Sequence, residues 1–189
     1  MKENKLTRTF IAIDFPSEVI KEVARVQEVL GKQKFTGKMT ELENLHLTLK
    51  FLGEIDDEML DKVKKKLAGI EFKEFDGKLC EVGCFGPRGE PRIVWIKVCG
   101  EGVWELQKKI DLALEGMFKK EERFMSHLTI ARLKYVKDKK GFIEYVKNIG
   151  LKEIKFRING FELKSSELRA LGPVYTMIEK YRNKKKQLM

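Results

Sequence analysis

The sequence is poor in long apolar runs, and this shortage excludes whole classes of protein. No apolar run approaches the roughly 18 residues that a membrane-spanning helix needs. The first ten residues, MKENKLTRTF, carry charges and contain no apolar stretch before a small-residue cleavage site. We therefore expect no secretory signal and a cytoplasmic protein without membrane contact.

Cysteine is also scarce. Cys80, Cys84 and Cys99 form neither an even set nor a C-x-x-C pair. In a cytoplasmic protein this pattern favours reduced, largely buried thiols over a disulfide or a metal site.

Acidic residues are fewer than basic ones, which leaves a formal net charge of +10 over 189 residues. Such an excess favours a polyanionic partner, because each phosphate that the protein neutralises releases condensed counterions. A lysine-rich surface that is simply solvated explains the same number, and composition alone does not separate the two.

Apolar periodicity predicts alternating strands and helices. The expected strands lie at 7–15, 44–53, 75–85, 91–100, 125–133, 154–164 and 173–181. The expected helices run from Pro16 to Gly31, from Asp56 to Gly69, from 103 to 117 and from 138 to 149.

The same order of elements occurs twice, which indicates an internal duplication. No linker is rich enough in Pro or Ser to separate independent domains. We expect one two-lobed domain over residues 1–189, with approximate sequence halves 1–88 and 89–181 and a basic tail at 182–189.

The chain has only two histidines, and each opens the same short frame. The frames are ENLHLTLKFLGE around His46 and FMSHLTIARLKY around His127. Alternate side chains of a strand share a face, so His46 and Thr48 point one way. Leu47, Leu49 and Phe51 are then expected to point the other way, into a core.

The second frame repeats this arrangement with His127 and Thr129 on one face and Leu128 and Ile130 on the other. If a pseudo-twofold axis relates the two halves of the chain, the two imidazole–hydroxyl pairs face each other across a cleft.

Two imidazoles and two hydroxyls around one cleft suit phosphoryl chemistry without a metal. A neutral imidazole acts as a base and a protonated one as an acid, while hydroxyls hold the oxygens where charge develops. Zinc sites need three or four protein ligands, and neither frame carries a carboxylate or thiolate at ligand spacing. Alternatively, both histidines are core residues that happen to share a local sequence. The repetition of the whole frame disfavours this alternative.

At these residues the sequence resembles the 2H phosphoesterase superfamily, and most closely its RNA 2′,3′-cyclic phosphodiesterases, also called 2′-5′ RNA ligases. The segments RTFIAIDFP, ENLHLTLKFLGEI, PRIVWIKV, SHLTIAR and LKSSELRALGPVY resemble family segments in the right order. One departure is Ser126, where the family often has proline before the second histidine.

The resemblance implies an α+β, two-lobed, pseudo-twofold fold in which antiparallel sheets line a central cleft and helices lie outside. It implies hydrolysis of an RNA 2′,3′-cyclic phosphate to a 2′-phosphate, with His46 as proton donor and His127 as proton acceptor. Thr48 and Thr129 would hold the phosphate oxygens. No cofactor or metal is implied, and the reverse reaction would form a 2′-5′ linkage.

Three further residues are candidates for substrate binding. Arg132 matches a family arginine near the nucleotide, although strict alternation places it on the core face unless the strand ends or bulges first. Phe10 would flank the base or belong to the core. Arg92, with Arg88, lies in the turn GCFGPRGEPR, which would contact RNA or form a plain hairpin.

The implied partner is RNA with 2′,3′-cyclic phosphate ends, tRNA fragments included, bound by a monomer. Two alternatives stay open at this point. One is a 2H phosphoesterase that acts on another small nucleotide, and the other is a nucleotide- or RNA-binding module that has lost turnover.

Overall fold

The computed structural model describes residues 6–170 and 172–183. The strands are β1 (Thr7–Asp14), β2 (Phe35–Met39), β3 (His46–Ile55), β4 (Phe75–Phe85), β5 (Ile93–Cys99), β6 (His127–Val136), β7 (Lys155–Ile158), β8 (Gly160–Arg169) and β9 (Gly172–Arg182). The helices are α1 (Ser17–Leu30), α2 (Asp57–Ala68), α3 (Glu101–Ala113) and α4 (Lys139–Lys147), with short 3-10 turns η1 (Leu42–Asn44) and η2 (Pro87–Gly89).

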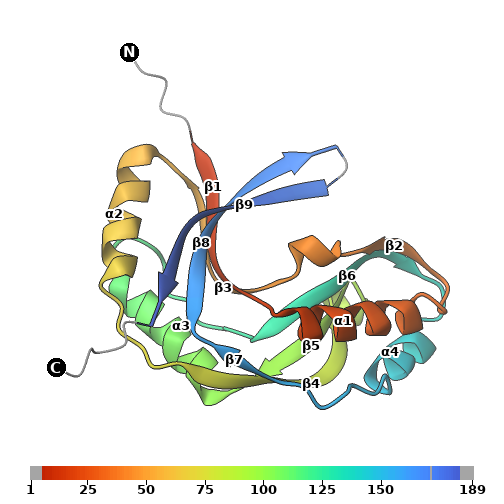
Figure 1. Ribbon diagram of the computed structural model, residues 1–189. Helices are drawn as coiled ribbons and strands as arrows, with labels where there is room; N and C mark the ends of the chain where they lie inside the picture. Colours follow the sequence, from red (N-terminus) through yellow and green to blue (C-terminus); the bar gives the residue numbers. More distant parts are fainter. Residues whose placement is uncertain (1–5, 171, 184–189) are drawn as a thin grey trace.

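The strands form one nine-stranded antiparallel sheet that bends sharply (Figure 1). Its order is β7-β4-β5-β6-β3-β1-β8-β9. Strand β2 pairs with residues 131–136 of β6, beyond the single pair that β6 makes with β3. At the bend β3 and β6 share only the pair Leu47 and Leu128. The four helices lie on the outer face of the sheet in Figure 1. The predicted α+β class, with antiparallel strands inside and helices outside, is confirmed.

The bend divides the sheet into two parts. We call β1, β3, β8 and β9 the His46 half, and β2, β4, β5, β6 and β7 the His127 half. Both halves draw on both ends of the chain, because β4 joins the His127 half while β8 and β9 join the His46 half.

The helices also cross over between the halves. Helix α1 follows β1 but packs on β6, and α3 follows β5 but reaches across to pack on β3 as well as on β4. The two repeated units therefore exchange their first helices across the bend, so that each half of the sheet is covered by a helix from the other unit.

The core fills the space between the outer face of the sheet and the helices. In α1 the apolar stripe predicted from the sequence is buried, with Val19, Val23 and Val26 at 0% exposure. The start of α2 is fixed by Asp56, whose Oδ1 accepts a hydrogen bond from the Met59 amide at 2.8 Å. Burial of these stripes drives the packing of helices on the sheet.

Three expectations about elements need correction. Strand β2 was not predicted, because its residues are mostly exposed and show no alternation. The predicted strand at 154–164 is two strands, β7 and β8, and α3 ends at Ala113, before Met117.

No helix in the described residues is long and apolar enough to cross a membrane.

The expectation of three reduced thiols is wrong for one pair. Cys80 and Cys99 form a disulfide between the neighbouring strands β4 and β5, with their Cα atoms 6.1 Å apart. Cys80 lies in an irregular stretch of β4 between Leu79 and Val82, and Cys99 pairs with Lys78. The pairing depends on strand register, which cysteine spacing does not reveal. Cys84 is free.

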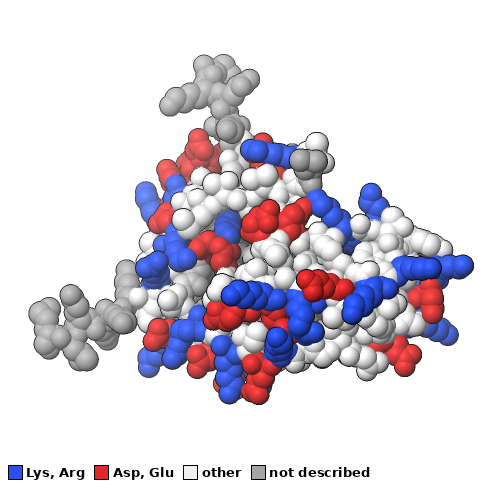
Figure 2. Space-filling model, turned by 45° about the vertical axis from the view of Figure 1, so that its right-hand side comes forward, with Lys and Arg blue, Asp and Glu red and all other residues white. Residues whose placement is uncertain are grey.

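The positive charge is spread out on the face of the molecule that Figure 2 shows. On the face in Figure 2, Lys and Arg side chains are interspersed with Asp and Glu instead of gathering in one basic patch. The predicted basic tail lies almost wholly outside the described residues, since 184–189 are not among them.

Candidate active site

The two histidine frames meet where the sheet bends. Leu47 and Leu128 pair across β3 and β6, and both are fully buried. The residues that flank them on each strand are half-buried and point to the opposite, inner face of the sheet. These flanking residues are His46, Thr48, His127 and Thr129. The antiparallel register places each imidazole level with the hydroxyl of the other frame.

Each imidazole is oriented by the main chain in the same way. Nδ1 of His46 lies 2.8 Å from the Asn44 carbonyl oxygen, and Nδ1 of His127 lies 2.7 Å from the Met125 carbonyl oxygen. Because a carbonyl oxygen only accepts, both bonds require a proton on Nδ1. Nε2 of each ring is therefore left for a substrate, as a lone pair in the neutral ring or as a donor in the protonated one.

His46 lies among aromatic rings. Its ring centroid is 4.9 Å from that of Phe10 and 5.0 Å from that of Tyr175. Burial lowers the pKa of His46 to about 4, and the positive charges of Lys164 and Arg132 act in the same direction. The imidazole is therefore neutral at pH 7 before any anion binds.

A chain of alternating charges lies beside His46. Asp14 pairs with His46 across β1 and β3, and its Oδ1 accepts a hydrogen bond from Lys164 at 2.5 Å. Lys164 also lies 3.5 Å from Glu162, which in turn binds Lys180 at 2.7 Å. Sequence reasoning missed these residues, because alternating charges on a C-terminal strand usually indicate an exposed face.

His127 has different neighbours. Its ring meets Phe85 edge-on at 5.4 Å between centroids. Trp95 pairs with Thr129 across β5 and β6, and its buried Nε1 has no hydrogen-bond partner within residues 6–170 and 172–183. Gly83 makes room for this indole, since an added Cβ would come within 2.4 Å of it.

Ser126 stands where the family often has proline, and it holds the start of β6. Its Oγ donates a 2.7 Å hydrogen bond to the Val98 carbonyl oxygen, and the Val98 amide donates to the Ser126 carbonyl oxygen at 3.1 Å. The segment before His127 is thus fixed by hydrogen bonds.

Arg132 reaches the inner face because β6 bulges. Trp95 pairs with Thr129 but Val94 pairs with Ala131, so Ile130 is an extra residue on β6. Ile130 and Ala131 are both fully buried, and the alternation resumes with Arg132 exposed. The condition set by the sequence, a bulge before Arg132, is met.

A matching bulge in β3 overturns the expectation for Phe51. Ala12 pairs with Thr48 but Ile11 pairs with Lys50, so Leu49 is the extra residue. Phe51 is therefore 68% exposed instead of buried in the core. It follows His46 by the same five positions that separate Arg132 from His127. Strict alternation gave no signal for this residue.

Phe10 is buried, as a core residue would be, and it also contacts aromatic rings of the inner face. It is only 2% exposed, yet its ring lies 6.2 Å from Phe51 and 5.1 Å from Tyr175, on the inner face. Its ring therefore packs against the rings of Phe51 and Tyr175.

Arg92 is held by its own chain. Its guanidinium pairs with Glu90 at 2.9 Å and donates to the Lys134 carbonyl oxygen. To contact a phosphate, Arg92 would have to give up these two partners.

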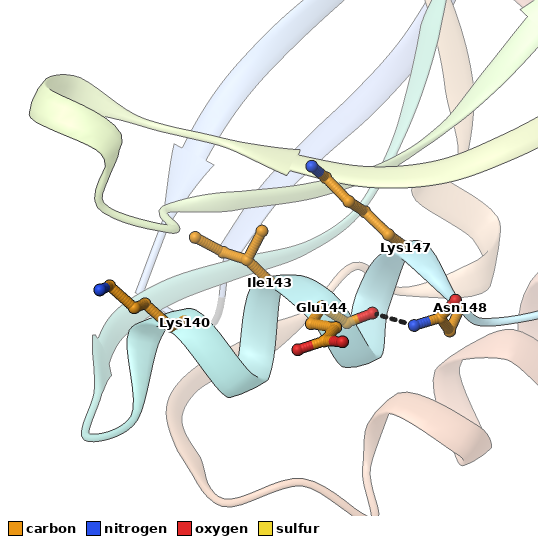
Figure 3. A pocket seen from close by; sticks show the side chains of 5 residues that line it. All are labelled: Lys140, Ile143, Glu144, Lys147 and Asn148. Carbon is orange, nitrogen blue, oxygen red and sulfur yellow. Dashed lines mark hydrogen bonds between the residues drawn. The ribbon is translucent and has the colours of Figure 1, made fainter.

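No group of three or more potential metal-ligating side chains occurs in the described part of the chain. A hollow of about 370 Å³ lies on the outer helix α4, beside Ile143 and Lys147 (Figure 3). It opens among the side chains of one helix and is separate from the histidines.

Comparison with known proteins identifies the family and the fold of the chain. Residues 13–95 and 98–175 match the family described as LigT like Phosphoesterase. An RNA 2′,3′-cyclic phosphodiesterase of Methanocaldococcus jannaschii is 35% identical over 92% of this chain and 99% of its own length. An RNA 2′,3′-cyclic phosphodiesterase of Thermotoga maritima is 34% identical over 90% of this chain and 92% of its own length. The crystal structure of TT0787 of Thermus thermophilus superposes with a TM-score of 0.79 at 29% identity. The superposition covers 93% of this chain and 97% of TT0787.

Proposed function

The chain belongs to the LigT-like phosphoesterase family, and on that premise we propose that it hydrolyses RNA 2′,3′-cyclic phosphate ends to 2′-phosphates. The observation that carries the proposal is the pairing of two imidazole–hydroxyl frames at one strand junction, with each imidazole oriented through Nδ1 by a main-chain carbonyl. Relatives that bear this activity in their names match the chain over nearly its full length.

In the proposed mechanism His127 is the base and His46 the acid. Nε2 of His127 takes a proton from water while the water oxygen bonds to phosphorus in line with O3′. The P–O3′ bond breaks, and Nε2 of His46 gives its proton to O3′. The product is a 2′-phosphate with a free 3′-hydroxyl, and proton exchange with solvent resets both rings.

The low pKa of His46 makes this assignment depend on the substrate. The imidazole is neutral in the free protein, since its pKa is about 4. A bound cyclic phosphate places a negative charge against the ring and raises that pKa, so the acid takes up its proton as the substrate binds. The cycle therefore couples binding to protonation.

Thr48 and Thr129 are proposed to donate hydrogen bonds to the non-bridging oxygens, where charge accumulates in the pentacovalent state. Arg132 supplies a positive charge on the same face. Burial lowers the pKa of His46, and the charge of Arg132 lowers it further. Arg92 is proposed only as an outer contact for RNA, because its guanidinium is engaged.

The nucleoside is proposed to lie on the His46 half. Phe51 offers an exposed aromatic face there, and Phe10 and Tyr175 stand behind it. Bases stack on such rings without regard to sequence. The departing O3′ belongs to the ribose of this nucleoside, which places the acid on this half and the attacking water near His127.

Run in reverse, the same groups join a cyclic phosphate to a 5′-hydroxyl and form a 2′-5′ bond. We further propose that the chain acts on RNA ends, tRNA fragments included, as a monomeric single domain in the cytoplasm, without a cofactor. The domain proposal rests on the continuous sheet, whose two halves meet at β3 and β6 and are linked by the crossed helices.

The direct experiment incubates the protein with adenosine 2′,3′-cyclic phosphate in EDTA. Formation of 2′-AMP supports the proposal, whereas 3′-AMP would contradict the leaving group. Tight binding without turnover would favour the binding module.

A substrate with sulfur at the 3′ position tests the roles of the histidines. The departing thiolate needs no proton, so the acid becomes dispensable. We expect this substrate to restore turnover to His46→Ala and not to His127→Ala; the opposite pattern would exchange the two roles.

A further inference from the structure

The bulge that turns Arg132 onto the inner face is held by a side chain from helix α1. Gln27 Nε2 donates hydrogen bonds to the carbonyl oxygens of Ile130, at 2.9 Å, and Thr40, at 2.7 Å. Ile130 is the extra residue of β6. Its carbonyl oxygen also accepts from the Thr40 amide at 2.9 Å. Three chain segments therefore meet at this one carbonyl group.

The bulge needs such support, because an extra residue interrupts the ladder of hydrogen bonds between strands. Without it, regular alternation from Thr129 would return Ala131 to the inner face and turn Arg132 toward the helices. The same shift would expose the buried side chain of Ala131 and bury a guanidinium, which is costly without a partner.

The corresponding bulge of β3 is held in a comparable way by the other crossed helix. Lys50, next to the extra residue Leu49, donates to Asp111 Oδ1 at 2.5 Å and to the Lys119 carbonyl oxygen at 2.7 Å. Gln107 donates to the other oxygen of Asp111 at 2.6 Å. Each crossed helix thus sends polar side chains to the bulge of the half that it covers.

We propose that Gln27 is a positioning residue, which holds the bulge of β6 so that Arg132 faces the substrate phosphate. This inference rests on the proposed function. Gln27 touches no substrate and acts only through Arg132, which lies on the strand that its amide secures.

The test compares Gln27→Met, Arg132→Ala and the double variant in the hydrolysis of adenosine 2′,3′-cyclic phosphate. Met keeps the length of Gln and removes both hydrogen bonds. We expect Gln27→Met to lower kcat/KM about fivefold, the scale of one or two lost hydrogen bonds. In the Arg132→Ala background the same change should have no further effect, because the residue through which it acts is gone.

A matched control is Gln33→Met, the same chemical change just beyond the end of α1, which should leave kcat/KM unchanged. If Gln27→Met does not fold, Gln27→Glu replaces it, since a carboxylate has the same shape but offers no donor to either carbonyl.

A second readout does not need activity. The chain has only two histidines, so each imidazole can be followed separately by proton NMR as the pH changes. Arg132 contributes to the low pKa of His46 alongside burial, so Arg132→Ala should raise that pKa. Gln27→Met should raise it too, and the double variant should match Arg132→Ala alone.

The outcomes separate the two proposals. A wild-type protein that leaves the cyclic phosphate intact defeats the proposed function, while the NMR comparison still decides the role of Gln27. Equal effects of Gln27→Met with and without Arg132 would show a purely structural role and overturn the inference. An unchanged His46 pKa in Gln27→Met, or an Arg132→Ala variant as active as wild type, would overturn it as well.

Discussion

The two halves of the sheet share one backbone plan and surround their histidines differently. In both, a main-chain carbonyl two residues earlier in the chain orients Nδ1, and a threonine follows on the same face. His46 is enclosed by Phe10 and Tyr175, whereas His127 meets Phe85. The same backbone geometry therefore occurs twice, and the side chains around it make the two copies chemically distinct.

The position five residues after each histidine shows the divergence best. Matching bulges bring Phe51 and Arg132 to the inner face, one aromatic and one cationic. An apolar ring suits a nucleobase and a guanidinium suits a phosphate. A symmetric backbone thus presents an asymmetric surface, which an asymmetric substrate requires.

The largest expected effect concerns the histidines themselves. His46→Ala and His127→Ala should each lower kcat by about a thousandfold, because each removes one partner of the acid–base pair. Steady-state kinetics in EDTA measures this, with circular dichroism to verify folding. A loss confined to one variant would break the view that both halves take part in the reaction.

The threonines should have smaller and similar effects. Thr48→Val and Thr129→Val keep the shape and remove the hydroxyl donor, so we expect about a hundredfold loss of kcat for each. Thr→Ser at either position should retain most activity, since it keeps the hydroxyl. Full activity of the Val variants would remove the hydroxyls from the mechanism.

The enclosure of His46 should also appear in stability. Its pKa is about 4 when folded, against a reference value of 6.5, so between these values only the unfolded chain binds the proton. The stability from this group is full above pH 6.5 and is lost as the pH falls to 4, on the order of 3 kcal/mol.

Urea unfolding of the wild type and of His46→Asn at several pH values measures this contribution. The variant should lose less stability than the wild type between pH 6.5 and 4. Identical pH dependences would show that His46 is not held neutral by its surroundings.

A smaller effect than that of the histidines and threonines is expected for Phe51. Phe51→Leu should raise KM for adenosine 2′,3′-cyclic phosphate about tenfold, because base stacking is lost. Tyr135→Leu is the matched control, since Tyr135 is also a largely exposed aromatic residue of a central strand, at 61% exposure. A methyl riboside 2′,3′-cyclic phosphate has no base, so its KM should not respond. An equal response of both substrates would contradict stacking.

Much of the fold could be predicted from local pattern. The stripe of α1, the cap of α2 and the alternation around each histidine are signals carried by neighbouring residues. The two-residue period of a strand predicted that His46 shares a face with Thr48, and His127 with Thr129.

What failed depended on register and on distant partners. Phe51 was misplaced because one extra residue, Leu49, inverts the alternation after it. The Cys80–Cys99 disulfide and the Asp14–Lys164–Glu162 cluster depend on which strands become neighbours.

The sequence by itself determined the composition of the site: two imidazoles, two hydroxyls and the strands that carry them. Only the tertiary structure decided that Phe51 and Arg132 face the site, because a bulge in each strand turns them to the inner face. It also decided the neutral state of His46, since a pKa responds to the burial and charges around a ring, and these come from residues far apart in the chain.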